Sequence, residues 1–266
     1  MSWWWLAYPL LGVFAGFVAG LFGVGGGLTI VPLLFMLFSA QDFPAAHSMH
    51  LALGTSMATI VFTSISSMRA HHRHGAVRWD IVKSFAPGLM LGTFAGSFVA
   101  TWVPTRPLAM IFTAIVYYAS LQMILDFKPK PHRALPGAVG MSVAGAAIGI
   151  VSSLVAAGGG FLSIPFMVFC NVVIHHAVGT SAALGFPIAL AGTVGYIVSG
   201  LKATGLPAYS LGYVYLPAFV GVVALSFMTA PLGAKLAHKL PVKQLKRAFG
   251  GFLALLATKM LHGLLS

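Results

Sequence analysis

Long apolar stretches separated by short polar or basic segments divide the chain into two halves with the same plan. In the first half, this pattern predicts helices over residues 4–22, 28–38, 49–68, 81–100 and 108–125. In the second half, it predicts helices over residues 137–155, 161–169, 177–198, 211–232 and 249–265. A helix needs about 20 apolar residues to cross the hydrocarbon core of a bilayer. We therefore expect an all-α polytopic membrane protein with about eight spans and two half-length segments, at residues 28–38 and 161–169.

The half-length segments follow a glycine motif that occurs once in each half. Each copy is a glycine triplet, four further residues and a proline: Gly25, Gly26, Gly27 and Pro32, then Gly158, Gly159, Gly160 and Pro165. A histidine, three residues and a Gly-Thr-Ser triplet come next: His50, Gly54, Thr55 and Ser56, then His175, Gly179, Thr180 and Ser181. These matches indicate an internal duplication, with repeat 1 at residues 1–127, a linker at residues 128–135 and repeat 2 at residues 136–266.

The composition indicates a membrane protein without a cofactor. Apolar residues make up 59% of the chain and charged residues 7%, and the mean hydropathy is +0.95, which excludes an ordinary soluble domain. The single Cys170 argues against a disulfide, an iron–sulfur cluster or a cysteine zinc site. The histidines at positions 71, 72 and 74 resemble a metal-binding tract, but they lie in a basic loop with no acid nearby. We interpret this tract as a lipid-facing patch, and expect no cofactor, no metal and no enzymatic activity.

The charge is strongly basic. The formal net charge is +12, and the only acids are Asp42, Asp80 and Asp126. In a soluble protein this excess would favour nucleic acid as a partner. In an apolar chain, basic loops that orient the helices and contact anionic lipid explain it better. We therefore expect a lipid bilayer and a small anion as partners, and no nucleic acid.

The basic residues are concentrated in three segments. Residues 69–78 carry three arginines, the linker region carries Lys128, Lys130 and Arg133, and residues 235–247 carry four lysines and one arginine. The intervening loops carry only Arg106 or Lys202. An odd number of crossings per half inverts the second repeat relative to the first and brings the three basic segments to one face. Because basic loops stay in the cytoplasm, we expect inverted repeats with both termini in the periplasm.

The glycine breaks suggest an anion-binding site. Backbone that leaves the helix within the hydrocarbon region must be buried or line a wet cavity. A new helix starts after each triplet, and its first N–H groups have no partner inside the helix and attract anions. We expect the two ends, at Leu28 and Phe161, to converge near the middle of the protein. The alternative is that the glycines only allow close helix packing, as we expect for Gly12, Gly16 and Gly20.

The Gly-Thr-Ser triplets allow two interpretations. In the first, Thr55, Ser56, Thr180 and Ser181 line a substrate cavity together with His50 and His175. In the second, the hydroxyls bond to backbone one turn back and the histidines lie at the interface. No predicted membrane segment contains a buried carboxylate, which favours an anion over a cation as the substrate. Proton coupling would then rest on His50 or His175, and sodium coupling on backbone carbonyls.

The doubled Gly-Gly-Gly-x4-Pro motif with its Gly-Thr-Ser triplet resembles the TauE/SafE family of sulfite and organosulfonate exporters. The resemblance covers nearly the whole chain. It implies a bacterial inner-membrane carrier of small sulfur oxyanions or related organic anions, working by alternating access. The residues that match the family's motif are Gly25, Gly26, Gly27, Thr55, Ser56, Gly158, Gly159, Gly160, Thr180 and Ser181.

Two points stay open at this stage. In the second copy of the motif, Ala156 and Ala157 replace the glycine-bearing lead-in at Gly23 and Val24. This departure allows the two half-sites to differ in strength. An anion channel of the same fold is the alternative to a carrier, and it would show flux without saturation or exchange.

Overall fold

The computed structural model describes residues 4–22, 26–125, 133–237 and 242–265. In the first half the helices are α1 (Trp4–Phe22), α2 (Gly27–Ala40), α3 (Ser48–Arg73), α4 (Trp79–Trp102) and α5 (Thr105–Leu125). In the second half they are α6 (Ala138–Val155), α7 (Gly160–Phe169), α8 (Ile174–Gly200), α9 (Leu216–Ala237) and α10 (Val242–Leu265). Gly25 and most of the predicted linker at residues 128–135 lie outside the described residues.

All ten predicted helices are present among the described residues, and several extend beyond the apolar pattern, α3 and α10 by the most. Helix α3 continues from the predicted end at residue 68 to Arg73, and α10 begins at Val242 rather than at residue 249. The last turn of α3 contains His71, His72 and Arg73. Basic side chains are favourable at a helix C-terminus because of the helix dipole, so the histidine tract is partly helical and not wholly a loop as predicted.

A short β-hairpin, which the sequence did not predict, precedes α9. Strands β1 (Ser210–Leu211) and β2 (Val214–Tyr215) pair in antiparallel register. The turn contains Gly212, whose φ of 54° lies in the left-handed region that favours glycine. The helix predicted from residue 211 therefore starts at Leu216, after the hairpin.

On length and composition, six of the described helices can cross a membrane. They are α3, α4, α5, α6, α8 and residues Gln244–Leu265 of α10. The described parts of α1 and α9 contribute shorter apolar segments, Leu6–Ala19 and Leu216–Ala230, and α2 and α7 are shorter than a bilayer span. The half-length segments are thus confirmed, whereas the total of eight spans stays a prediction.

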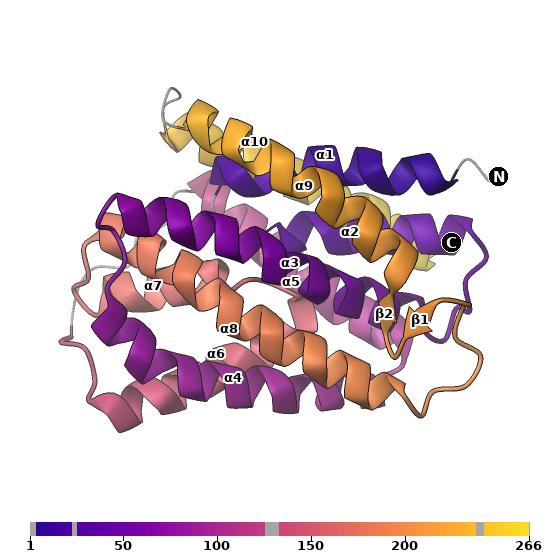
Figure 1. Ribbon diagram of the computed structural model, residues 1–266, viewed down its shortest axis with the longest axis horizontal. Helices are drawn as coiled ribbons and strands as arrows, with labels where there is room; N and C mark the ends of the chain where they lie inside the picture. Colours follow the sequence, from indigo (N-terminus) through magenta and orange to yellow (C-terminus); the bar gives the residue numbers. More distant parts are fainter. Residues whose placement is uncertain (1–3, 23–25, 126–132, 238–241, 266) are drawn as a thin grey trace.

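The first helix of each half packs along the fourth helix of the other half. Helix α1 lies beside α9, and α6 lies beside α4 (Figure 1). A Cβ at Gly12 would lie 2.9 Å from the Cα of Val222, and one at Gly92 would lie 2.7 Å from the Cα of Ala146. Backbones this close have no space for a side chain between them. The expected packing role is confirmed at Gly12 and likewise at Gly16, and Gly20 lies outside the part whose side-chain surroundings are described.

Helices α3 and α8 form the centre of the bundle and pack against each other. The apolar windows of these two candidate spans are 67% and 61% buried, more than those of the other candidate spans among the described residues. Helix α3 also contacts α9, α8 also contacts α4, and α2 and α7 lie against α3 and α8 respectively. Each half therefore contributes one central helix, and each glycine break lies beside the central helix of its own half.

Candidate functional site

Each glycine break ends in a left-handed glycine that caps a half-length helix. Gly26 caps α2 with a φ of 75°, and Gly159 caps α7 with a φ of 84°. These φ values require glycine or cost about 1–2 kcal/mol with any other L-residue. The middle glycine of each triplet is therefore explained by backbone geometry.

The first turn of each half-length helix leaves amide groups free of helical partners. The carbonyl oxygen of Gly26 accepts hydrogen bonds from the amides of Thr29 and Ile30, at 3.0 and 2.9 Å. The carbonyl of Gly159 accepts them from the amides of Leu162 and Ser163, at 3.3 and 2.9 Å. The amides of residues 27–28 and 160–161 come earlier in these first turns, and they have no partner inside the helix. Both breaks thus present helix N-termini of the type that binds anions.

The two breaks lie against each other. A Cβ added to Gly27 would overlap the carbonyl oxygen of Ala156. Ala156 stands where a glycine would be expected by comparison with the first copy, and it adopts a left-handed φ of 45°. Residue 27 in the first half thus contacts residue 156 in the second half. This contact brings the two glycine breaks together, in agreement with the expected convergence of the two helix ends.

The breaks also lie level with the middle of the two central helices. A Cβ on Gly27 would lie 2.9 Å from Cδ1 of Ile60 in α3, and one on Gly159 would lie 2.5 Å from Cδ1 of Ile188 in α8. A Cβ on Gly185, also in α8, would lie 3.0 Å from the carbonyl oxygen of Gly158. Ile60 and Ile188 are near the midpoints of α3 and α8. The breaks are therefore buried halfway along the longest helices of the bundle.

The threonines of the Gly-Thr-Ser triplets hold the opposite half of the protein. The hydroxyl of Thr55 accepts a hydrogen bond from the amide of Tyr215, just before α9, at 3.0 Å. The hydroxyl of Thr180 accepts one from the amide of Arg78, just before α4, also at 3.0 Å. Both threonines have no exposed surface. Each hydroxyl thus caps the fourth helix of the other half, which differs from the expected bond to backbone one turn back.

The glycines of the same triplets allow this docking. A Cβ on Gly54 would lie 2.9 Å from the carbonyl carbon of Tyr213, and one on Gly179 would lie 2.6 Å from the carbonyl oxygen of Ala76. Each glycine therefore lets the segment before the opposite fourth helix approach the central helix. The Gly-Thr pair acts as one docking element in both halves.

The serines of the triplets face a different part of the structure. Ser181 lies with its hydroxyl 2.8 Å from that of Ser163 in α7, and Ser163 donates a hydrogen bond of 2.6 Å to the carbonyl oxygen of Gly159. Ser181 therefore reaches the second glycine break. Among the described residues, Ser56 in the first half has no hydrogen-bond partner, although its side chain is fully buried.

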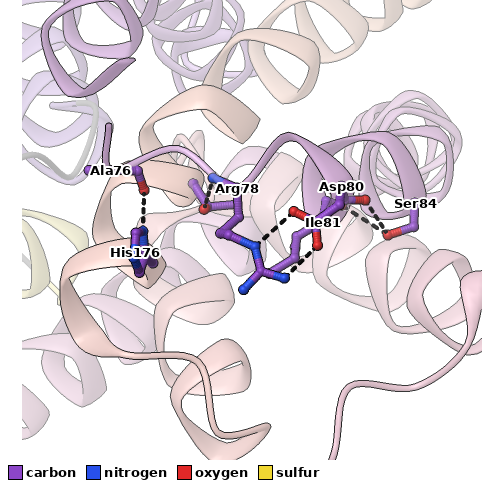
Figure 2. Close-up of polar contacts among 7 residues, drawn as sticks. Ala76, Arg78, Asp80, Ile81, Ser84 and His176 are labelled. Atoms are coloured by element: carbon purple, nitrogen blue, oxygen red, sulfur yellow. Dashed lines mark hydrogen bonds and ion pairs between the residues drawn. The ribbon is translucent and has the colours of Figure 1, made fainter. Parts of the chain in front are cut away.

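The two motif histidines have different surroundings. His50 is buried, and its Nε2 lies 3.2 and 3.1 Å from the carbonyl oxygens of Ala100 and Val103. Because carbonyl oxygens only accept, Nε2 carries the hydrogen. His175 is exposed at the start of α8, and its neighbour His176 instead makes the backbone contact, from Nδ1 to the carbonyl oxygen of Ala76 at 3.3 Å (Figure 2). The sequence repeat thus does not extend to the histidine environments.

An exposed ion pair stabilises the segment on which Thr180 docks. Figure 2 shows the guanidinium group of Arg78 against the carboxylate of Asp80, with Nε 2.8 Å from Oδ1. The hydrogen bond to Asp80 raises the pKa of Arg78, so this residue stays charged. Asp42 and Asp80 are both exposed, so neither is a buried carboxylate. Within the described ranges, no group of three or more potential metal ligands occurs.

Two hydroxyl residues of this region were missing from the sequence-based set. Thr29 and Ser163 lie in the first turns of α2 and α7 and have no exposed surface. Each is the polar residue in an otherwise apolar start of a half-length helix, Gly-Leu-Thr-Ile in α2 and Gly-Phe-Leu-Ser-Ile in α7. A polar residue at that position was a sequence signal that could have identified both.

Comparison with known proteins gives one family and several relatives. The sequence model described as "Sulfite exporter TauE/SafE" matches residues 8–260. A probable membrane transporter protein of Haemophilus influenzae is 41% identical over 94% of this chain and 96% of its own length. Probable membrane transporter proteins of Bacillus subtilis (YdhB) and Methanocaldococcus jannaschii are 28% and 24% identical, over 90% and 96% of this chain and 91% and 96% of their own lengths. No solved structure gives a significant match.

Proposed function

The chain belongs to the sulfite exporter TauE/SafE family and is a membrane transporter, and we propose that it carries small sulfur oxyanions or organosulfonates such as sulfite. The proposed location is a bacterial inner membrane. The observation that carries this proposal is the meeting of the two glycine breaks, at Gly27 and Ala156, halfway along α3 and α8.

The chemistry of this meeting point supports an anionic substrate. Two helix N-termini, from α2 and α7, point partial positive charge and free amides toward a buried region. A cation carrier normally needs a buried carboxylate in its membrane segments, and the described acids, Asp42 and Asp80, are exposed. A small oxyanion accepts hydrogen bonds from amides and hydroxyls alike. The substrate that fits these donors is therefore an anion with several acceptor oxygens.

We assign the site to the residues of the two motif copies. The backbone groups belong to Gly25, Gly26, Gly27, Gly158, Gly159 and Gly160, and the hydroxyl donors are Ser56 and Ser181. Thr55 and Thr180 act on the site by holding α9 and α4 in place. His50 and His175 stay the candidates for proton coupling.

The helix pairing supports alternating access with inverted repeats. Helices α1 and α9 form one pair and α4 and α6 form another, and in each pair the two halves of the chain contribute one helix. Inverted repeats that exchange helices in this way can rock as units about a central site. We propose that these two pairs move relative to the α3–α8 centre and expose the glycine breaks to each side in turn.

Exchange of labelled substrate distinguishes a carrier from a channel. We expect purified protein in proteoliposomes to take up labelled sulfite faster when unlabelled sulfite is inside the vesicle. The reason is that the binding site of a carrier reorients across the membrane more quickly with substrate bound than when empty. The same uptake is then measured with sulfoacetate, thiosulfate or sulfate inside the vesicle. The degree of stimulation ranks these anions as substrates. Uptake that does not saturate and is not stimulated from the opposite side would favour an anion channel of the same fold.

The proposed topology predicts which loops a membrane-impermeant thiol reagent reaches in intact cells. In a Cys170→Ala background, we expect His74→Cys, in the α3–α4 loop, to be protected from reagent applied outside. Thr204→Cys, in the loop after α8, should be labelled. Both positions are exposed, so permeabilised cells provide the control in which both should react. Labelling of His74→Cys in intact cells would contradict inverted repeats with periplasmic termini.

A further inference from the structure

The two glycine breaks have the same backbone but use their hydroxyl groups differently. Both cap a half-length helix with a left-handed glycine, and both have a buried serine from the neighbouring central helix, Ser56 in α3 and Ser181 in α8. In the second break these groups bond to one another, whereas in the first they do not. This difference has a definite origin in the sequence.

The second break satisfies the hydrogen bonds of its own serine hydroxyls. Ser163 donates its single hydroxyl hydrogen to the carbonyl oxygen of Gly159 at 2.6 Å. Because that hydrogen is used, the 2.8 Å contact between the two serine hydroxyls has Ser181 as the donor and Ser163 as the acceptor. The relay from Ser181 through Ser163 to Gly159 is complete without a ligand. All its side-chain groups are buried, with exposures of 0% for Ser163 and 1% for Ser181.

The first break has no such relay because the corresponding residue is apolar. Ser163 is the fourth residue after the capping Gly159, and the fourth residue after Gly26 is Ile30. Ile30 has no hydroxyl that could accept a hydrogen bond from Ser56. The polar residue in the first turn of α2 is instead Thr29, one position earlier. In the described part of the chain, neither the Thr29 hydroxyl nor the Ser56 hydroxyl has a hydrogen-bond partner, and both residues are 0% exposed.

Buried hydroxyls without partners destabilise a fold, and such groups in a native protein call for an explanation such as a missing ligand. Thr29 is the third residue of α2, so its hydroxyl lies in the same first turn as the free amides of residues 27–28. Ser56 belongs to α3, against which α2 packs. Two hydroxyls and two amides can all donate hydrogen bonds, and an anion with several oxygens can accept them.

We propose that the first break is the half-site that binds the anion in this conformation, through the hydroxyls of Thr29 and Ser56, whereas the Ser181–Ser163–Gly159 relay holds the second break closed. This inference rests on the proposed function, and it names the binding groups within that site. The ligand group is an oxyanion, whose oxygens can accept hydrogen bonds from both hydroxyls and both amides. The second break becomes available to the anion only when the bond between Ser163 and Ser181 opens.

Matched hydroxyl deletions test the proposal on full-length protein in nanodiscs. The probe is sodium sulfite at a pH where it is fully ionised, with affinity measured by calorimetric titration and stability by the melting temperature without ligand. Thr29→Val and Ser56→Ala should each weaken sulfite binding about tenfold, which corresponds to one lost hydrogen bond of about 1.4 kcal/mol. Their ligand-free melting temperatures should be unchanged or higher, because each removes a hydroxyl without a partner.

Ser163→Ala is the matched control in the second break. It should lower the ligand-free melting temperature and should not weaken sulfite binding, because it breaks an existing relay, removes no group that contacts the ligand and frees the Ser181 hydroxyl. The opposite pattern would overturn the proposal: Ser163→Ala weakening sulfite binding, or Thr29→Val and Ser56→Ala lowering the melting temperature at full affinity.

A substitution that imitates the second break provides an independent test. Ile30→Thr keeps the β-branched shape and places a hydroxyl four residues after Gly26. This hydroxyl can donate a hydrogen bond to the carbonyl oxygen of Gly26 and accept one from Ser56. We expect it to weaken sulfite binding about tenfold by competing for Ser56, and unchanged affinity would contradict the proposal. A wild-type protein that binds none of sulfite, thiosulfate and sulfoacetate would overturn the proposed function itself. If the wild type binds sulfite but the variants of the two breaks do not differ in affinity and melting temperature as expected, only the assignment of the first break as the binding half-site is overturned.

Discussion

Replacing Gly27 with alanine is expected to abolish transport. The added Cβ would overlap the carbonyl oxygen of Ala156, which belongs to the other glycine break, and would lie 2.9 Å from Cδ1 of Ile60. The isoleucine side chain can rotate away. The carbonyl oxygen can move only with its backbone, which is held in a left-handed turn at φ 45°. The two breaks must therefore separate.

The expected cost of this overpacking is about 1–3 kcal/mol of unfolding free energy, and transport per folded molecule should fall more than tenfold because the shared site is displaced. Counterflow in proteoliposomes and the melting temperature, measured on the same preparation, test both effects. Gly251→Ala in α10 is the control, since a Cβ there would have no atom within 4 Å. Normal stability and transport in Gly27→Ala would show that the two breaks do not meet.

Removing both docking hydroxyls, with Thr55→Val and Thr180→Val, is expected to have the second large effect. Each valine keeps the shape of threonine but leaves the amide of Tyr215 or Arg78 without its acceptor. Both hydrogen bonds are part-buried, and an amide left without its acceptor costs about 1 kcal/mol, rising to about 3 kcal/mol where water is fully excluded. The two sites lie on different central helices and share no hydrogen-bond partner, so their effects should add. The double variant should lose about 2–6 kcal/mol and yield little folded protein.

Thr59→Val is the matched control for these substitutions. Among the described residues, the hydroxyl of Thr59 bonds only to the carbonyl oxygen of Thr55 in its own helix, at 2.9 Å, so its loss should change the melting temperature little. The same measurements decide between the two interpretations of the Gly-Thr-Ser triplets. If Thr55→Val melts like wild type but binds sulfite more weakly, the threonine contacts the substrate rather than the opposite half of the protein.

The helices and the two glycine breaks could be predicted from the sequence alone, whereas the division into two repeats stays a prediction. The length of an apolar run sets whether a helix can cross a bilayer, so all ten segments could be located from local composition. Glycine is required wherever φ is positive, which made the caps at Gly26 and Gly159 visible as a repeated motif. The ends of α3 and α10 and the hairpin before α9 were not predicted, because charged helix ends and short turns depend on their surroundings.

The contacts of the motif residues depend on tertiary packing. Thr55 bonds to Tyr215 across 160 positions of sequence, and Thr180 bonds to Arg78 across 102. Such contacts depend on how the two halves pack, and no local pattern encodes them. The equal spacing of the two motif copies predicted equal roles for His50 and His175, yet one is buried against carbonyl groups and the other is exposed. The two glycine motifs have the same backbone geometry at Gly26 and Gly159, whereas the partners of the motif side chains are residues that differ between the two halves.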